Sequence, residues 1–483
     1  MELQDKDLLS IQEVRHMISK ANEAQKKFAE FSQEAINKIV YAMKEASYRQ
    51  AEILGQLASE ETGFGKWQDK KAKNQIASEG VYNHIKDMKT IGIIREDGEK
   101  KIVEIGTPVG TIAALIPSTN PTSTVIYKTL IALKSGNAIV FSPHPSALKS
   151  IIRTVEILDK AAVEAGAPEG LIHCMTKPTM EGTSELMQHK GIDLILATGG
   201  SAMVKAAYSS GNPALGVGPG NVPAFVERSA NIKEAIEKIV LSKTFDNGTV
   251  CASEQAIVTE RCIAEKVKEE IKSQGGYFLT GDHLEKVTAI METVTGGMNP
   301  KIVGKSALDI AEMAGIEIPK ETKILLSEER NVGKNIPFSK EKLTALLAFY
   351  TVEDWQEACE LCYSLLENGG LGHTLAIHSK NEAIIKEFAL KKPVSRFLVN
   401  TPSTQGAIGL STNLAPSFTL GCGAIGGSAT SDNVGPMHLI NVRSMAYGID
   451  EDKKTVEKED LSSIDIDAIT QLVMEGLKNK LNN

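Results

Sequence analysis

The sequence predicts an α/β protein with two parallel-sheet units in series and a small β arm. Between residues 109 and 226, short apolar runs alternate with helical stretches, a pattern typical of parallel βαβ units. A second alternating series runs from residue 232 to about residue 399. The segment 91–107 differs from both, because two β-prone runs flank a turn that contains Asp97 and Gly98. We expect a hairpin there, with Asp-Gly supplying the positive φ angles of a tight turn.

Composition and charge exclude several classes of protein. The chain has 483 residues, of which 42% are apolar and 24% charged, as in ordinary globular proteins. The net charge is -8 and the Lys and Arg residues are scattered, which argues against a nucleic-acid-binding surface. No apolar run is long enough to span a membrane, and no apolar leader precedes Leu8. The six cysteines have no disulfide spacing, so we expect a reducing, cytoplasmic compartment.

The N-terminal stretch from about residue 10 to residue 60 is expected to be helical. Its apolar residues Ile36, Ile39, Val40 and Met43 recur at three- and four-residue spacing, which places them on one face of a helix.

Cys251 is the candidate nucleophile. It lies in FDNGTVCASEQ, a polar turn between a helix and a strand, where a thiolate would be partly exposed and near backbone N–H donors. A lone cysteine is more often an inert packing residue, so the catalytic interpretation of Cys251 depends on the other motifs of the sequence. Asn120 ends another strand in IPSTNPTST, and its side-chain amide can donate to a developing oxyanion from that position.

Two glycine-rich turns are candidate cofactor-binding loops. ATGG closes a strand and opens a helix, and glycines at such a turn let a dinucleotide phosphate approach the backbone of Thr198, Gly199 and Gly200. GVGPGN, at 216–221, is the second turn, although the same pattern also suits an ordinary loop.

Taken together, the order and spacing of these motifs resemble the aldehyde dehydrogenase superfamily from about residue 10 to about residue 447. IPSTNP resembles the asparagine motif of that family, and TVCASEQ resembles its nucleophile motif. EKLTALLAFY resembles the segment that carries a ribose-contacting glutamate, which is Glu341 here. The resemblance implies that Cys251 attacks the aldehyde, that Asn120 stabilises the oxyanion and that NAD accepts the hydride.

The resemblance also implies a domain plan. It consists of a Rossmann-like cofactor domain with the hairpin arm, an α/β catalytic domain, a return segment with an oligomerisation strand, and an added linker with an amphipathic helix. A homodimer or a dimer of dimers follows from the same likeness. The expected bounds are 1–228 with the arm at 91–107, 229–400, 401–448 with the strand near 436–447, and 449–483.

Two departures from the main family pattern indicate one branch of it. Hydrolytic members carry a water-activating glutamate 34 residues before the cysteine, where this chain has Val217. They also carry a lysine for the adenosine ribose where FSPHPSA places Ser142, with His144 two residues later. Both departures, together with GVGPGN and GLGHT, resemble the CoA-acylating branch, which includes the aldehyde half of bifunctional alcohol/aldehyde dehydrogenases. Without their iron-dependent half, the chain resembles the stand-alone enzymes.

The chemistry of this branch explains why a valine at position 217 bears on the reaction. With no base to activate water, a thioester on Cys251 persists until the thiolate of coenzyme A, a better nucleophile than neutral water, captures the acyl group. The implied reaction is acetaldehyde with NAD+ and coenzyme A to acetyl-CoA and NADH. Two alternatives stay open: the same chemistry on propionaldehyde or sulfoacetaldehyde, and a non-catalytic structural member. A sulfonate requires Arg or Lys at the pocket mouth, and the sequence does not place Arg153, Lys205 or Arg396 there.

The candidate site residues follow from these motifs. Cys251, Asn120 and His373 are the candidate catalytic residues, and no metal site is expected. The candidate residues for binding NAD or coenzyme A are Ser142, Pro143, His144, Thr198, Gly199, Gly200, Val217, Gly218, Gly220 and Glu341.

Some of these residues have a second interpretation. His373, in GLGHT, either eases deprotonation of a thiol or is a structural histidine that bonds a turn. His144 either contacts the adenosine of NAD or coenzyme A, or caps the helix that begins near Ser146. Cys359 and Cys362 form a C-x-x-C within a helix and are interpreted as core positions rather than metal ligands.

The C-terminal helix has three interpretations. Ile466, Ile469, Val473 and Leu477 recur at helical spacing after a charged linker, so the helix has an apolar stripe that nothing in its own segment covers. It packs on a partner subunit, or is disordered, or docks on a shell protein of a bacterial microcompartment, as a similar extension does in related enzymes. The last interpretation places the protein inside a microcompartment of the cytoplasm.

Overall fold

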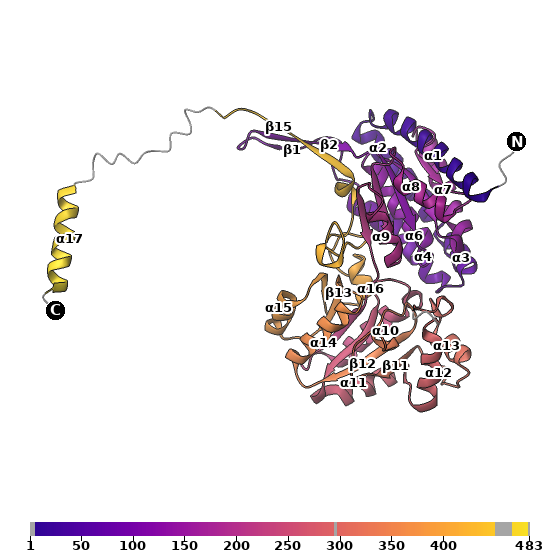
Figure 1. Cartoon of the computed structure of the whole chain (residues 1–483), viewed down its shortest axis with the longest axis vertical. Coiled ribbons are helices and arrows are strands. Elements are labelled where there is room, and N and C mark those ends of the chain that lie inside the picture. Colours follow the sequence, from indigo (N-terminus) through magenta and orange to yellow (C-terminus); the bar gives the residue numbers. More distant parts are fainter. Residues whose placement is uncertain (1–4, 294–296, 450–465, 482–483) are drawn as a thin grey trace. The chain divides into compact units, whose positions relative to one another are not determined.

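The computed structural model, drawn in Figure 1, describes residues 5–293, 297–449 and 466–481. Its contacts divide the chain into two compact units. The first unit holds both parallel sheets and comprises residues 1–92 and 106–441, and the second comprises residues 93–105 and 442–483.

The N-terminal part of the first unit is helical, as predicted. The first helix begins after Asp5, whose carboxylate accepts the N–H groups of Asp7 and Leu8, and the second begins after Ser32, whose hydroxyl accepts the N–H of Ala35. These helices are α1 (Lys6–Phe28), α2 (Gln33–Arg49), α3 (Ala51–Thr62), α4 (Trp67–Gln75) and α5 (Val81–Ile85), with a π-helical turn at Ile76–Gly80 before the last.

The first sheet is parallel and has five strands in the order β5-β4-β3-β6-β7. The chain begins in the middle of this sheet, builds outward on one side and then crosses to the other, so the strand order reverses between β3 and β6. Ligands of open α/β sheets bind beyond the carboxyl ends of the strands at such a point. The elements are β3 (Thr111–Ile116), α6 (Pro121–Lys134), β4 (Ala138–Pro143), α7 (Leu148–Glu164), β5 (Ile172–Cys174), α8 (Met180–Gln188), β6 (Leu194–Thr198), α9 (Ser201–Tyr208) and β7 (Ala214–Val217).

The second sheet is parallel and has seven strands in the order β10-β11-β12-β9-β8-β13-β14. Apolar clusters cover both of its faces: Phe225 belongs to one cluster, and Ala224 and Val226 belong to the other. This double burial explains the near-continuous apolar runs in the sequence. The elements are β8 (Val222–Val226), α10 (Ile232–Thr244), β9 (Glu254–Glu260), α11 (Arg261–Ser273), β10 (Gly276–Phe278), α12 (Gly281–Met291), α13 (Ala307–Ala314), β11 (Ile324–Glu328), β12 (Leu346–Val352), α14 (Trp355–Glu367), β13 (Gly372–His378), α15 (Glu382–Lys391), β14 (Val394–Val399) and α16 (Ser403–Ala407).

One strand lies in a different sheet from the one the sequence predicts. The run VPAFV, at 222–226, falls inside the predicted first domain, but it forms β8, which pairs with β9 and β13 of the second sheet. The chain therefore passes between the sheets in the turn 218–221, directly after β7. A fully buried apolar strand has the same pattern in either sheet, so periodicity alone does not assign it.

The arm is a sheet of three strands in the order β1-β2-β15, formed by β1 (Gly92–Asp97), β2 (Ile102–Pro108) and β15 (Ile440–Ala446). Both the hairpin and the added strand are as predicted, but the turn is not. A longer loop joins β1 to β2, and the positive φ lies at Lys101, with 54°, instead of at Asp97 and Gly98. The Asp97 carboxylate accepts the N–H of Lys100 and so closes this loop.

The C-terminal helix is α17 (Ile466–Leu481). Ile469, Val473 and Leu477 of the expected apolar stripe are about half exposed, at 52%, 54% and 52%. The expected charged linker lies outside the described residues apart from Ile449.

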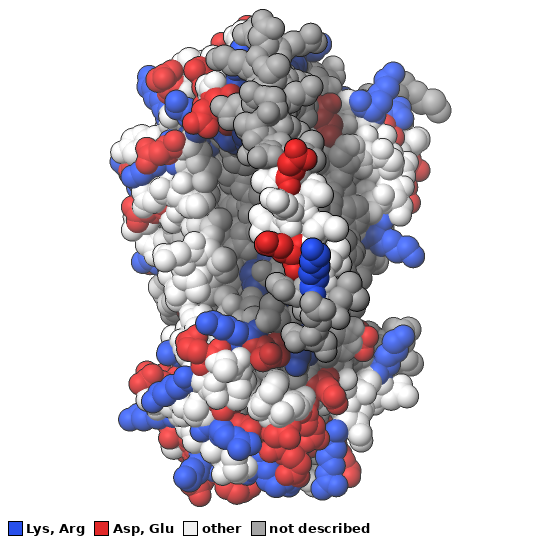
Figure 2. Space-filling view, turned by 90° about the vertical axis from the view of Figure 1, so that its left-hand side faces the viewer, with Lys and Arg blue, Asp and Glu red and all other residues white. Residues whose placement is uncertain are grey.

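Over the face drawn in Figure 2, acidic and basic side chains are interspersed.

Among the helices of the described ranges, none has the length and hydrophobicity required to cross a bilayer.

Tyr127 connects α6 to the return segment that follows α16. Its fully buried hydroxyl donates to the carbonyl oxygen of Val434 and accepts from Ser417 Oγ at 3.0 Å. Replacing Tyr127 with Phe removes the donor and leaves a buried carbonyl unpaired. We therefore expect Tyr127→Phe to lower the free energy of unfolding by about 1–3 kcal/mol in urea denaturation, with an unchanged m-value.

The control for Tyr127→Phe is Tyr41→Phe, since Tyr41 is 49% exposed. That variant should stay within about 0.5 kcal/mol of the parent protein. Equal stability of the two variants would show that the Tyr127 hydroxyl contributes nothing.

Candidate active site

A cavity of about 280 Å³ opens at the point where the strand order of the first sheet reverses. The turn after β3, from Pro117 to Asn120, lines it together with the turn after β6, at Gly199 and Gly200. Residues from the second sheet's side complete the wall, Cys251 among them. The structure thus brings the motifs around Asn120, Thr198 and Cys251 to one place, although they are far apart in the sequence.

The predicted site residues divide into two groups. Those that line the cavity are Asn120, His144, Thr198, Gly199, Gly200, Val217, Gly218, Cys251 and Glu341. Those that are not among its lining residues are Ser142, Pro143, Gly220 and His373.

A left-handed turn presents Cys251 to the cavity. Asp246, Asn247 and Gly248 have φ angles of 49°, 51° and 76°, a region where side chains other than those of Asn and Asp are rare. A Cβ on Gly248 would stand 2.9 Å from the carbonyl oxygen of Thr344, so only glycine fits there. Consecutive residues in this conformation store strain that the surrounding structure must hold, as is typical of functional sites.

The Cys251 thiol is partly buried at the cavity wall. Burial raises the pKa of Cys251 to about 12, and the neighbouring Glu341 and Cys422 add to that increase, while Arg396 opposes it. The sulfur is therefore protonated at neutral pH in the free protein, and a catalytic cycle must supply a group or a step that removes its proton.

Asn120 precedes α6, and its side chain contacts the turn that leads to Cys251. Its amide nitrogen Nδ2 lies 3.2 Å from Thr119 Oγ1 and 3.4 Å from the carbonyl oxygen of Thr249. Asn120, Thr249 and Cys251 all line the cavity, so an N–H donor and a thiol border the same space. A donor in such a place can stabilise an oxyanion formed on the sulfur.

Val217 ends β7 and is buried in the cavity wall. Of the described residues that line the cavity, Glu341 is the one with a carboxylate. Its Oε1 accepts the backbone N–H of Gly220 at 3.0 Å, and burial raises the pKa of Glu341 to about 7. Position 217, where the resemblance to hydrolytic members would require a glutamate, therefore holds an apolar side chain, and the carboxylate of the described lining belongs to Glu341.

Gly220 packs tightly between Cys251 and His373. A Cβ at Gly220 would lie 2.3 Å from the carbonyl oxygen of Cys251 and 3.1 Å from two atoms of the His373 ring. His373 is fully buried, with Nδ1 2.9 Å from Thr374 Oγ1. Burial, together with the nearby Arg396, lowers the pKa of His373 to about 3, so its ring is neutral. This geometry favours the structural interpretation of His373 over that of a base in the cavity.

His144 has the hydrogen bond of a cap and also lines the cavity. Its Nδ1 accepts the N–H of Ser146 at 3.1 Å, at the start of a short helical turn. The ring proton of the neutral imidazole must then be on Nε2, which is left as a donor for a ligand. Two residues before His144, the Ser142 hydroxyl lies 2.8 Å from the Thr183 hydroxyl, and Pro143 is the last residue of β4.

The three cations considered for a sulfonate lie elsewhere. Arg153 pairs with Glu156 at 3.1 Å on the surface. Lys205 lines a neighbouring groove of about 540 Å³. Arg396 is buried and donates to the carbonyl oxygens of His373 and Gly421, at 2.9 and 2.6 Å. The described lining of the 280 Å³ cavity has no Lys or Arg, so a sulfonate would find no cationic partner among those residues.

Sequence analysis missed the apolar end of the cavity. Ile408, Phe418 and Leu420 line it and come from a segment rich in Gly, Ser and Thr. Apolar residues spaced through such a segment were the available signal. The C-x-x-C pair, in contrast, has the core positions that the sequence predicts, since Cys359 and Cys362 are both buried in α14.

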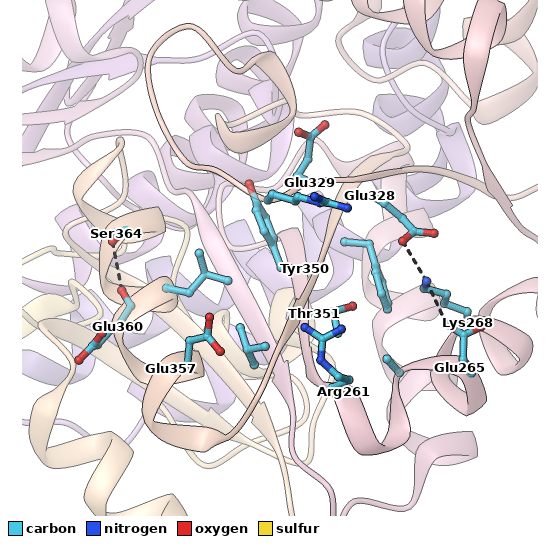
Figure 3. Close-up of a pocket in the computed structure, with 15 residues that line it drawn as sticks. Arg261, Glu265, Lys268, Glu328, Glu329, Tyr350, Thr351, Glu357, Glu360 and Ser364 are labelled. Atoms are coloured by element: carbon cyan, nitrogen blue, oxygen red, sulfur yellow. Dashed lines mark hydrogen bonds and ion pairs between the residues drawn. The ribbon is translucent and has the colours of Figure 1, made fainter.

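A larger cavity, of about 930 Å³, lies between α11 and α14 (Figure 3). Its charges are partly paired, since Lys268 bonds Glu328 at 2.9 Å and Glu265 at 3.2 Å. Its described lining contains neither cysteine nor histidine and none of the predicted site residues. Size alone therefore does not identify the site.

Comparison with known proteins gives consistent matches. The profile of the aldehyde dehydrogenase family matches residues 6–314. The bifunctional aldehyde-alcohol dehydrogenase AdhE of Escherichia coli K12 is 43% identical over 442 residues, which are 90% of this chain and 50% of that protein. The chain thus spans about half the length of this curated relative.

Two solved structures are similar over nearly their whole length. An acetylating aldehyde dehydrogenase from Geobacillus thermoglucosidasius has 55% identity and a TM-score of 0.91, with 93% of this chain and 99% of that chain covered. A propionaldehyde dehydrogenase from the fucose utilisation microcompartment of Clostridium phytofermentans has 30% identity and a TM-score of 0.83, with 90% and 97% covered.

The raised pKa of Cys251 predicts how the free protein reacts with an alkylating agent. Since the thiolate is the reactive form, alkylation of Cys251 by iodoacetamide should be slow at pH 7 and should rise about tenfold per pH unit to pH 10, with no plateau. Peptide mass spectrometry measures the rate, in a Cys262→Ser background that removes an exposed competing thiol. A plateau below pH 8 would mean that the thiolate is already stabilised in the free protein.

Proposed function

The chain belongs to the aldehyde dehydrogenase family, and on that premise we propose that it is an NAD-dependent, CoA-acylating aldehyde dehydrogenase for short, uncharged aldehydes such as acetaldehyde. The observation that carries the proposal is Val217 in the cavity wall beside Cys251, where a hydrolytic enzyme requires a base. A thioester formed there is protected from activated water and is available to a thiol.

The cavity has the features that a dinucleotide needs. It lies at the strand-order reversal of the first sheet, where such cofactors bind. Gly200 precedes α9 without any side-chain cap, so the first N–H groups of that helix are free to meet a phosphate. His144 Nε2 and the carboxylate of Glu341 are the further polar groups that we assign to cofactor binding, and bound NAD+ supplies the acceptor for a hydride.

The residues of the chain would act in sequence. The Cys251 thiolate adds to the aldehyde carbonyl, and the Asn120 N–H stabilises the resulting oxyanion. Loss of the hydride turns the adduct into a thioester on Cys251. The thiolate of coenzyme A then attacks the thioester carbon, and Cys251 leaves as a thiolate with its acyl group transferred. Gly220 packs against both the carbonyl oxygen of Cys251 and the His373 ring.

The apolar end of the cavity suits a short alkyl chain. Ile408, Phe418 and Leu420 would surround it, and the lack of Lys or Arg in the described lining disfavours a sulfonate. Propionaldehyde is the second candidate substrate, because one similar structure is that of a propionaldehyde dehydrogenase.

The substitution Val217→Glu tests the proposal directly. A carboxylate at this position should activate water, so NADH formation without coenzyme A should rise at least tenfold and free acid should replace part of the acyl-CoA product. The assay follows NADH absorbance with and without coenzyme A and quantifies both products. Val217→Gln is the control of equal size without a base, and Cys251→Ala should abolish turnover.

If the parent protein forms NADH equally fast without coenzyme A, water already deacylates it and the proposed function is wrong. If Val217→Glu yields only acyl-CoA, position 217 does not decide the fate of the thioester.

We also propose that α17 docks on a microcompartment shell protein. Its residues Ile469, Val473 and Leu477 are about half exposed, and a similar enzyme comes from such a compartment. Deleting residues 450–483 should leave turnover intact and abolish co-purification with the shell protein. Leu477→Glu in the full chain should also abolish it, and Asp467→Asn should not. Loss of turnover on deletion would instead make the segment part of the catalytic fold.

A further inference from the structure

A buried cluster of charges lies directly behind the Cys251 turn. Helix α4 places Lys70 and Lys73 three residues apart on one side, where both meet the carboxylate of Asp246. The distances from the two Nζ atoms to Asp246 Oδ2 are 3.0 and 2.5 Å, and the exposed fractions of the three side chains are 2%, 1% and 0%. Burial by itself would raise the pKa of Asp246, but Lys73 and Lys70 hold it below its ordinary value.

The two lysines differ in their second contacts. Lys70 donates to the backbone carbonyl oxygen of Thr119 at 3.1 Å. Lys73 donates to Asn120 Oδ1 at 2.6 Å and to Thr249 Oγ1 at 3.1 Å. Lys73 therefore touches the side chain proposed to hold the oxyanion, whereas Lys70 touches only the backbone beside it.

The contact with Lys73 fixes which end of the Asn120 amide faces the reaction. An ammonium group only donates, so the atom that meets it must be the amide oxygen. The Nδ2 donors then point toward Thr119 Oγ1 and the Thr249 carbonyl, on the Cys251 side. Those contacts, at 3.2 and 3.4 Å, are longer than the usual N–H···O distance of about 2.9 Å, so this donor group is only weakly engaged before a substrate binds.

We propose that Lys73 is a positioning residue: it orients and polarises the Asn120 amide so that an N–H, not the carbonyl oxygen, faces the oxyanion. A cation on the amide oxygen draws electron density from the nitrogen and strengthens its N–H as a donor. Asp246, which also accepts the N–H of Lys66 at 2.7 Å, fixes the Lys73 ammonium. This inference rests on the proposed function, in which Asn120 is the oxyanion donor.

A double-mutant cycle separates this role from a structural one. Removing one oxyanion donor costs about 10²–10³ in kcat, so Asn120→Ala should fall in that range. Lys73→Met should lower kcat at least tenfold on its own, with the KM for NAD+ and coenzyme A within twofold. In the Asn120→Ala background, Lys73→Met should add less than threefold, because the group through which it acts is absent.

Lys70→Met is the matched control. Lys70 lies on the same helix as Lys73, bonds the same Asp246 carboxylate and is equally buried. Its second acceptor is the Thr119 carbonyl oxygen, however, and not the Asn120 side chain. The thermal midpoint of Lys70→Met should fall about as much as that of Lys73→Met, while its kcat should stay within threefold of the parent.

The outcomes distinguish the inference from the function on which it rests. A tenfold loss from Lys73→Met in the Asn120→Ala background, or an equal loss from Lys70→Met, would overturn the positioning role and leave the proposed reaction standing. Unchanged kcat in Asn120→Ala would overturn the oxyanion role and the inference with it. If Lys73→Met is too unstable to assay, Lys73→Arg enters the same cycle, and its partial loss should likewise vanish in the Asn120→Ala background.

Discussion

The close approach of the Gly220 backbone to the carbonyl of Cys251 is the contact on which the site depends. It leaves no room for a side chain, because a Cβ would stand 2.3 Å from that oxygen. Gly220 lies in the turn that joins the last strand of the first sheet to β8 of the second. Val217 at the end of β7 and Gly218 in this turn line the cavity, and the N–H of Gly220 donates to Glu341. One backbone contact thus sets the distance between the wall that would hold the cofactor and the nucleophile.

The charge distribution of the interior follows from the same junction. Lys73, Lys128 and Lys243 are fully buried where helices meet the strand ends, and each donates to oxygen atoms of turns or strands. Burial lowers the pKa of Lys73 to about 8 and that of Lys243 to about 7. Lys128 and Lys243 donate to backbone carbonyl groups of strand residues, whereas the acceptors of Lys73 are side-chain oxygens of Asp246, Asn120 and Thr249.

Sequence reasoning predicted the alternation of strands and helices, the hairpin arm and the convergence of Asn120 and Cys251. The resemblance to the aldehyde dehydrogenase family implied that convergence; strand geometry alone did not, because Asn120 follows β3 of the first sheet and Cys251 precedes β9 of the second. It did not assign β8, because a buried apolar strand looks the same in either sheet. Nor did it indicate Lys73, which lies in the run WQDKKAKN and has the pattern of a solvated helix face. Such a lysine is identified only when Asp246, distant in the chain, is placed against it.

The protonated state of the Cys251 thiol in the free protein has a consequence for its oxidation. Peroxides and other oxidants attack the thiolate form of cysteine, and a sulfenic or sulfinic acid at Cys251 would end its use as a nucleophile. Burial raises the pKa of Cys251 to about 12, which keeps the thiolate scarce between turnovers. We therefore expect oxidants to react more slowly with Cys251 in the free protein than with a cysteine of ordinary pKa.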